Sequence, residues 1–169
     1  MVTVSLTRVL IDGTILSLLL SALIFGSLAW NPRLWMQDFP APVRDRMAPL
    51  TAPEKRIQRL RLLPCVGLFI ALPLLSAHWL GVESGATLPF ATFYVHIFLV
   101  LMVFNVFDAV VIDWLVLAQF RPKFAMVPEA AGLEYTLHDP RLHIVNFLKG
   151  VVFCAVFSAP LALAALVLV

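Results

Sequence analysis

Four long runs of apolar side chains constrain the fold of this chain more than any other feature. They cover residues 9–30, 62–80, 88–120 and 146–169. Each is long enough for an α-helix to cross a hydrocarbon core, which takes roughly 20 residues. Membrane β-strands would instead show alternating runs of about ten residues. The sequence therefore predicts an all-α polytopic membrane protein, a four-transmembrane-helix bundle that forms a single integral membrane domain over residues 1–169.

Composition supports lipid as the surrounding solvent. Of the 169 residues, 62% are hydrophobic and 13% are charged, whereas soluble domains have about 45–50% apolar and about 25% charged residues. Disorder is excluded as well, because disordered chains combine low hydrophobicity with high charge. The lipid bilayer is therefore an expected partner. The net charge of +2 gives no reason to expect binding to nucleic acid.

Basic residues predict the orientation. All but one of the 12 lysines and arginines lie in or next to two connecting segments, residues 31–61 and 121–145, and only Arg8 lies elsewhere. Basic loops stay in the cytoplasm, so we expect both long loops inside the cell, both termini outside, and a multi-pass location in a prokaryotic plasma membrane. Ser27-Leu28-Ala29 has the small-x-small pattern of a signal-peptide cleavage site. We expect the first helix to be retained, because cleavage would put the basic loop outside.

Polar residues within the third run are the main functional candidates. Asn105 and Asp108 are three residues apart, which would place them on one face of an α-helix, and Asp113 follows. Ionisable residues inside spans are functional candidates by default. Two structural alternatives remain open: a hydrogen-bond clamp between helices, or aspartates at the inner headgroups with Asp113 paired to Lys149. Asp12, near the outer end of its span, is expected to be interfacial.

Histidines raise the question of a cofactor. His78 and His96 lie near the outer ends of neighbouring spans and could face each other across a haem. His138, Asp139 and His143, with Glu134 as a further candidate, are suitable ligand types for a divalent metal, but their spacing matches no zinc motif. Interfacial histidines and a polar contact between the second loop and the inner mouth of the bundle are the alternatives. Cofactor and metal are therefore left unknown.

Several short motifs resemble those of a group of uncharacterised bacterial and archaeal four-span integral membrane proteins. They are Asn31-Pro32-Arg33-Leu34-Trp35 with Asp38 and Pro40, Phe104-Asn105 with Phe107-Asp108 and Asp113-Trp114, Arg121-Pro122-Lys123, and His143 with Phe147-Leu148-Lys149-Gly150. The resemblance implies the architecture only.

The predicted topology brings these motifs to the cytoplasmic half of the membrane. We therefore expect one inner-leaflet polar site. Its candidate ligand-binding residues are Asn105, Asp108, Asp113, His143, Lys149, Arg33, Trp35 and Asp38.

Three functions are compatible with such a site. The first is binding of a small ligand, an ion or a lipid headgroup, with weak transport as an extension. The second is an accessory or structural subunit of a larger membrane complex, in which other membrane subunits or further copies of the chain are the partners. The third is a membrane-embedded redox or lipid-modifying enzyme. An enzyme is the less favoured reading, because the sequence has no nucleophile elbow, phosphate-binding glycine loop or zinc-protease motif.

Overall fold

The computed structural model describes residues 4–85 and 87–168, and all regular secondary structure within these residues is helical. Four stretches in this part of the chain are long and apolar enough to cross a membrane: Leu6–Trp30, Ala52–Ser84, Phe90–Phe120 and Pro140–Leu168. The predicted all-α chain with four candidate spans is therefore confirmed. Several helices are longer than the apolar runs from which they were predicted. The apolar run shows only the part that lipid can cover, whereas the helix itself ends where capping groups satisfy its free backbone donors and acceptors. Residue 169 lies outside the described residues.

The long helices follow the order of the apolar runs. They are α1 (Leu6–Trp30), α4 (Leu62–Ser84), α5 (Phe90–Phe107) and α6 (Pro140–Leu168), with α2 (Ala41–Arg44) and α3 (Ala52–Leu60) between α1 and α4. A π-helix, η2 (Asp108–Phe120), continues α5. Short 3-10 helices lie in the connections: η1 (Pro32–Asp38), η3 (Lys123–Ala125), η4 (Pro128–Ala130) and η5 (Glu134–His138).

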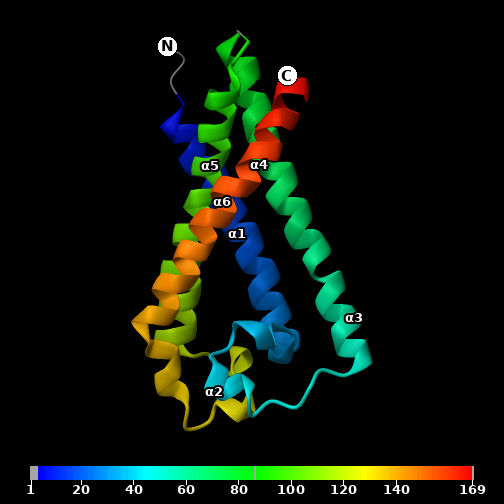
Figure 1. Ribbon diagram of the computed structural model, residues 1–169, viewed down its shortest axis with the longest axis vertical. Coiled ribbons are helices and arrows are strands. Elements are labelled where there is room, and N and C mark those ends of the chain that lie inside the picture. Colours follow the sequence, from blue (N-terminus) through cyan, green and yellow to red (C-terminus); the bar gives the residue numbers. More distant parts are fainter. Residues whose placement is uncertain (1–3, 86, 169) are drawn as a thin grey trace.

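The two ends of the bundle differ in what they carry. Both chain termini and the connection between α4 and α5 lie at one end, which we call the terminal end (Figure 1). The opposite end, which we call the loop end, carries the segments 31–51 and 121–139. The continuous helix of α3 and α4 leans away from the other helices towards the loop end (Figure 1).

Local chemistry explains where the helices begin and end. The Ser5 side chain accepts a hydrogen bond from the Arg8 backbone N–H at the start of α1. Thr51 and Glu54 form a reciprocal capping box at the start of α3, which satisfies backbone donors that have no partner within the helix. Gly85 ends α4 with a φ of 60°, a left-handed conformation that glycine adopts without steric cost.

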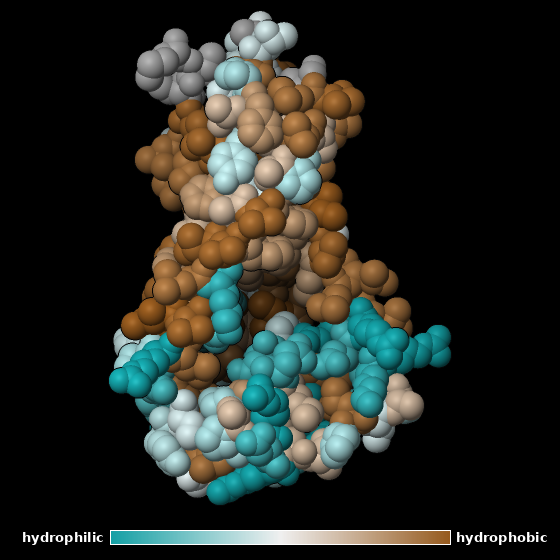
Figure 2. Space-filling view, in the orientation of Figure 1, coloured by the Kyte–Doolittle hydropathy of each residue, from teal (hydrophilic) through white to brown (hydrophobic). Residues whose placement is uncertain are grey.

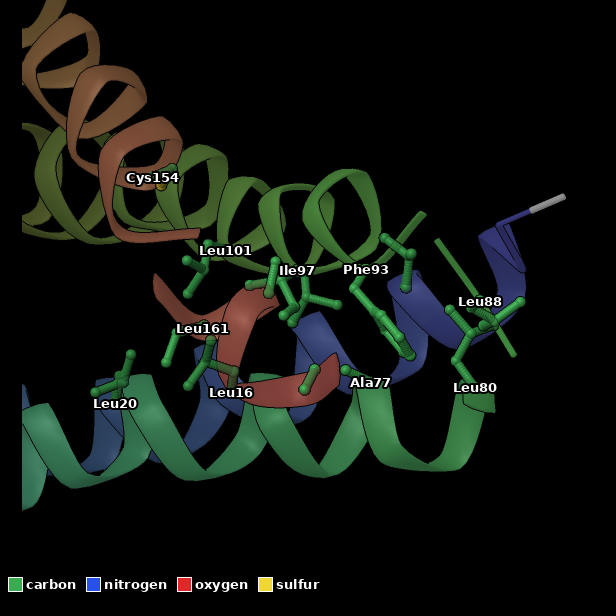
Figure 3. Close-up of a cluster of buried hydrophobic side chains, with 14 residues drawn as sticks. Leu16, Leu20, Ala77, Leu80, Leu88, Phe93, Ile97, Leu101, Cys154 and Leu161 are labelled. Carbon is green, nitrogen blue, oxygen red and sulfur yellow. The ribbon is translucent and has the colours of Figure 1, made fainter. Parts of the chain in front are cut away.

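The apolar core lies in the half of the bundle nearer the terminal end. Leu16, Leu20, Phe93, Ile97 and Leu101 are among its fully buried members (Figure 3). There α5 packs against α1, α4 and α6. The contact with α1 is close at Gly13, where an added Cβ would lie 2.5 Å from Val103 Cβ. Small residues allow helices in membranes to approach this closely.

The two long connections, the first over residues 31–51 and the second over residues 121–139, pack against each other at the loop end. A second apolar cluster joins Phe39, Val43 and Met47 of the first connection to Val127, Ala130 and Leu133 of the second. Arg33 adds polar links, since its guanidinium contacts Glu54 Oε1 and Glu129 Oε1, each at 3.2 Å. The connections therefore form an ordered cap under the bundle and position the side chains described next.

Candidate functional site

Six of the eight predicted site residues line one cavity of about 580 Å³ at the loop end. They come from three separate parts of the chain. Trp35 and Asp38 belong to η1, Asp108 and Asp113 to η2, and His143 and Lys149 to α6. Ile24 and Leu28 of α1 add an apolar wall. In Figure 2 the molecular surface is hollowed at the junction between the brown, apolar part and the teal, polar part.

The π-helical geometry of η2 brings Asp108 and Asp113 to the cavity together. In an α-helix, residues five apart point about 140° away from each other, since each residue turns about 100°. A π-helix instead bonds residue i to residue i+5, which returns the chain to nearly the same face. The bond from the Arg121 N–H to the Val116 carbonyl, 2.8 Å long, has this spacing.

The lining pattern of η2 shows the same period. Besides the two aspartates, Ile112, Leu117 and Ala118 line the cavity, so the inward positions recur every four to five residues. Val110 and Leu115 are exposed on the other side. π-Helical turns are rare and occur frequently at functional sites, and here such turns form the acidic wall.

Three carboxylates, those of Asp38, Asp108 and Asp113, line the same cavity. Asp108 lies within electrostatic reach of both Asp113 and Asp38. In the part of the chain that the structure describes, none of these three carboxylates accepts a hydrogen bond or joins an ion pair. The alternative in which Asp113 pairs with Lys149 is therefore not observed among the described residues, although both line the cavity. The site presents hydrogen-bond acceptors that the protein itself leaves unsatisfied.

Asp38 can be reached by solvent, and the surrounding protein still affects its charge. Desolvation by this protein raises the pKa of Asp38 above its ordinary value of 3.8, and the nearby positive charge of Arg61 opposes that rise. Desolvation disfavours the charged form of a carboxyl group. The protein around Asp38 therefore favours the neutral form of its carboxyl group.

His143 provides a fixed imidazole beside the acidic wall. Its Nε2–H donates to the Leu137 carbonyl at 2.8 Å, because a carbonyl oxygen can only accept. Its Nδ1 is buried without a partner among the described residues, and the ring lies within electrostatic reach of Asp113. The arrangement places a second type of proton-binding group next to the carboxylates.

The described residues do not form the metal site considered from the sequence. No group of three or more histidine, cysteine, aspartate or glutamate side chains among them is placed to hold a metal ion. The His143 Nε2 is occupied by Leu137, and Asp139 accepts a hydrogen bond from the Arg141 backbone N–H at 2.9 Å. The side chain of Glu134 lies outside what the structure describes.

Asn105 and Arg33 do not line the cavity. The Asn105 amide donates to the Phe147 carbonyl of α6 at 3.3 Å, and an added Cβ on Gly150 would lie 1.8 Å from Asn105 Oδ1. Asn105 therefore joins α5 to α6 by a hydrogen bond. This is the interhelical clamp, one of the two structural alternatives that the sequence left open. We expected Asn105 and Asp108 to face the site together, but only Asp108 lines the cavity. Arg33 joins α3 and η4 to the first connection.

A second polar network inside the bundle was missed by the sequence analysis. Asp12, which we expected to be interfacial, accepts a hydrogen bond through its Oδ2 from Ser76 Oγ at 2.6 Å. His96, which is fully buried, lies 2.7 Å from the same hydroxyl through its Nε2. Because Ser76 donates its only proton to Asp12, His96 Nε2–H must donate to Ser76. Arg8 Nη1 lies 3.6 Å from Asp12 Oδ2.

This network excludes the pairing of His78 with His96 around a haem. His78 is exposed and its ring contacts Trp79, whereas His96 is enclosed among α1, α4 and α5. The available signal was that Asp12, Ser76 and His96 all occur in the outer halves of their predicted spans. A polar group there requires partners, because lipid offers none.

Comparisons of the chain with protein families, with curated proteins and with solved structures find no match. The resemblance to uncharacterised four-span membrane proteins stays a prediction.

Proposed function

We propose that this chain is a multi-pass protein of the cell membrane and that its loop-end cavity binds a small polar ligand from the cytoplasmic side. The four long apolar helices support the membrane location. The basic residues of the two long connections support a cytoplasmic loop end, because positively charged loops resist translocation. With this orientation the cavity lies at the inner leaflet.

The convergence of Asp38, Asp108 and Asp113 on one cavity is the observation that carries the proposal. Carboxylates at this depth are costly unless a partner satisfies them. The fitting ligand donates hydrogen bonds or carries positive charge, as an ammonium group does. Lys149 and Arg44 on the lining add a basic side, so a ligand that also carries an anionic group fits as well.

The apolar walls favour an organic ligand over a bare ion. Ile24, Leu28, Ile112 and Leu117 line the same cavity as the carboxylates. Ligand sites commonly combine such apolar walls with a few fixed polar groups, in volumes of about 300–1,000 Å³. Trp35 contributes an aromatic face, which attracts organic cations. An amine-bearing lipid headgroup and a free small amine share this chemistry.

Native mass spectrometry of the protein extracted gently from its host membrane tests the proposal. We expect a reproducible small bound mass on the wild-type protein, and we expect Asp108→Asn to lose it because the substitution removes a carboxylate from the cavity. Asp45→Asn changes an exposed carboxylate outside the cavity and should keep the bound mass. The fragmentation spectrum of the released molecule separates a lipid headgroup from a free amine.

Three results would overturn ligand binding at this site. The first is a wild-type protein without any small bound mass, and the second is equal retention of that mass by Asp108→Asn. The third is co-purification of larger subunits with no small ligand, which would favour the accessory-subunit function. A visible chromophore would instead favour a redox enzyme.

A further inference from the structure

A narrow crevice of about 260 Å³ separates α1 from α4 near the loop end. Its walls are made by small or apolar side chains, including Ala22, Leu23 and Gly26 of α1 and Pro64 of α4. It exists because the helix formed by α3 and α4 leans away from α1 in this half of the bundle (Figure 1). The crevice is distinct from the larger cavity, and Trp35 lines both.

Gly26 shows that the crevice is open and not a tight contact between helices. An added Cβ at Gly26 would meet no atom within 4 Å. At Gly13, on the same helix, an added Cβ would collide with Val103. The small residues near the loop end of α1 therefore leave space that the chain does not fill, and in a membrane an apolar space of this kind is available to an acyl chain.

Arg61 places a positive charge at the loop end of this crevice. Its guanidinium carbon lies 3.6 Å from the centroid of the Trp35 ring, and its Nη2 donates to the Leu34 carbonyl at 2.9 Å. Its Nε is buried and has no hydrogen-bond partner among the described residues. The ring contact and the hydrogen bond thus hold the Arg61 guanidinium in place at the crevice.

Three more basic side chains precede Arg61 on the same helix. Lys55, Arg56 and Arg59 of α3 are exposed, and none of them takes part in the ion pairs of the described residues. Trp30, which also lines the crevice, is exposed at the same end. Tryptophan at this position is typical of the headgroup level, which is where a lipid phosphate would meet the basic side chains.

We propose that the crevice between α1 and α4 binds an anionic phospholipid, with an acyl chain along Gly26 and the phosphate at Arg61. Lys55, Arg56 and Arg59, on the other side of the same helix, add attraction to an anionic membrane surface. This inference rests on the proposed insertion of the four helices in a membrane. Arginine binds phosphate with several donors in a fixed plane, and basic residues beside a membrane attract anionic lipids. The bound lipid would pack against Trp35, which forms part of the ligand cavity.

Lipid counting by native mass spectrometry tests this site. The protein is reconstituted in nanodiscs with equal amounts of phosphatidylglycerol and phosphatidylcholine, and the lipids that remain bound are counted. We expect the wild-type protein to retain phosphatidylglycerol over phosphatidylcholine by about fivefold or more, the preference that one basic side chain near anionic lipid provides. Arg61→Gln should lose most of this preference, and Arg141→Gln, an exposed arginine elsewhere at the loop end, should keep it.

Gly26→Leu tests the contribution of the crevice separately from that of the positive charge of Arg61. It fills the space without altering any basic residue, so it should also reduce retention, and it keeps the test valid if Arg61→Gln does not fold. Equal retention of both lipids by the wild-type protein would overturn the proposal, as would an unchanged preference in either variant. Failure of the protein to enter the nanodiscs would instead contradict the proposed membrane insertion.

Discussion

Asp108 and Asp113 line the same cavity although they are five positions apart in the chain. The π-helix that begins at Asp108 brings both carboxylates to one side, whereas α-helical geometry would turn them about 140° apart. His143 and Lys149 reach this cavity from α6, and Trp35 and Asp38 reach it from the first connection. One irregular helix thus determines which polar side chains of the third span can act together.

The clamp between α5 and α6 can be tested by a double-mutant cycle. Asn105→Ala removes the bond to the Phe147 carbonyl, and we expect a loss of about 0.6–2 kcal/mol, the range for hydrogen bonds between membrane helices. Gly150→Ala places a Cβ against Asn105 Oδ1, and such overpacking typically costs about 1–3 kcal/mol. The measurement is thermal unfolding in detergent. In the Asn105→Ala background, Gly150→Ala should cost clearly less, and simple additivity would contradict this account of the contact.

The buried network at the terminal end predicts that two buried serines contribute differently to the free energy of unfolding. Ser76→Ala removes the hydroxyl that joins Asp12 to His96 and leaves both without that partner, so we expect about 1–3 kcal/mol of destabilisation. Ser158 is equally buried but only donates to the Cys154 carbonyl of its own helix. Ser158→Ala should therefore change the melting temperature much less. Equal effects of the two substitutions would show that the network adds no stability.

The raised pKa of Asp38 predicts a specific pH dependence of the melting temperature. Its pKa is raised in the folded protein, so its contribution is fully present below the unfolded value near 3.8 and is lost as the pH rises through the folded value. Asp38→Asn removes this dependence. Measured against Asp38→Asn, the wild-type protein should gain melting temperature as the pH falls from 7 towards 4. A constant difference across this range, or a difference of the opposite sign, would contradict the desolvation of Asp38.

Much of the fold follows from the sequence, because lipid permits few solutions. A run such as residues 9–30 has to form a helix, since no other backbone structure in it can satisfy its own hydrogen bonds in hydrocarbon. The predicted convergence of Trp35, Asp38 and His143 rests on the same logic, because the segments that carry them connect spans at the same end.

The remaining features depend on contacts that periodicity does not encode. Asn105 was grouped with Asp108 by α-helical spacing, but its amide donates to the Phe147 carbonyl of α6, whereas Asp108 lines the cavity. The partners of Arg33 lie 21 and 96 residues away in the chain, which local patterns cannot indicate. The network of Asp12, Ser76 and His96 requires three helices to be placed relative to one another, and no single apolar run determines that placement.

Cysteine labelling of η2 tests most directly that both aspartates face one water-accessible cavity. In a protein with Cys65 and Cys154 replaced by alanine, single cysteines are placed at Asp108, Asp113, Val110 and Leu115 and exposed to a charged, membrane-impermeant maleimide from the loop side. Only thiols that water can reach form the reactive thiolate. We predict that Asp108→Cys and Asp113→Cys both react, while Val110→Cys and Leu115→Cys, on the exposed side that lipid would cover, do not. Labelling of only one of the aspartate positions, or equal labelling of all four positions, would contradict the shared cavity.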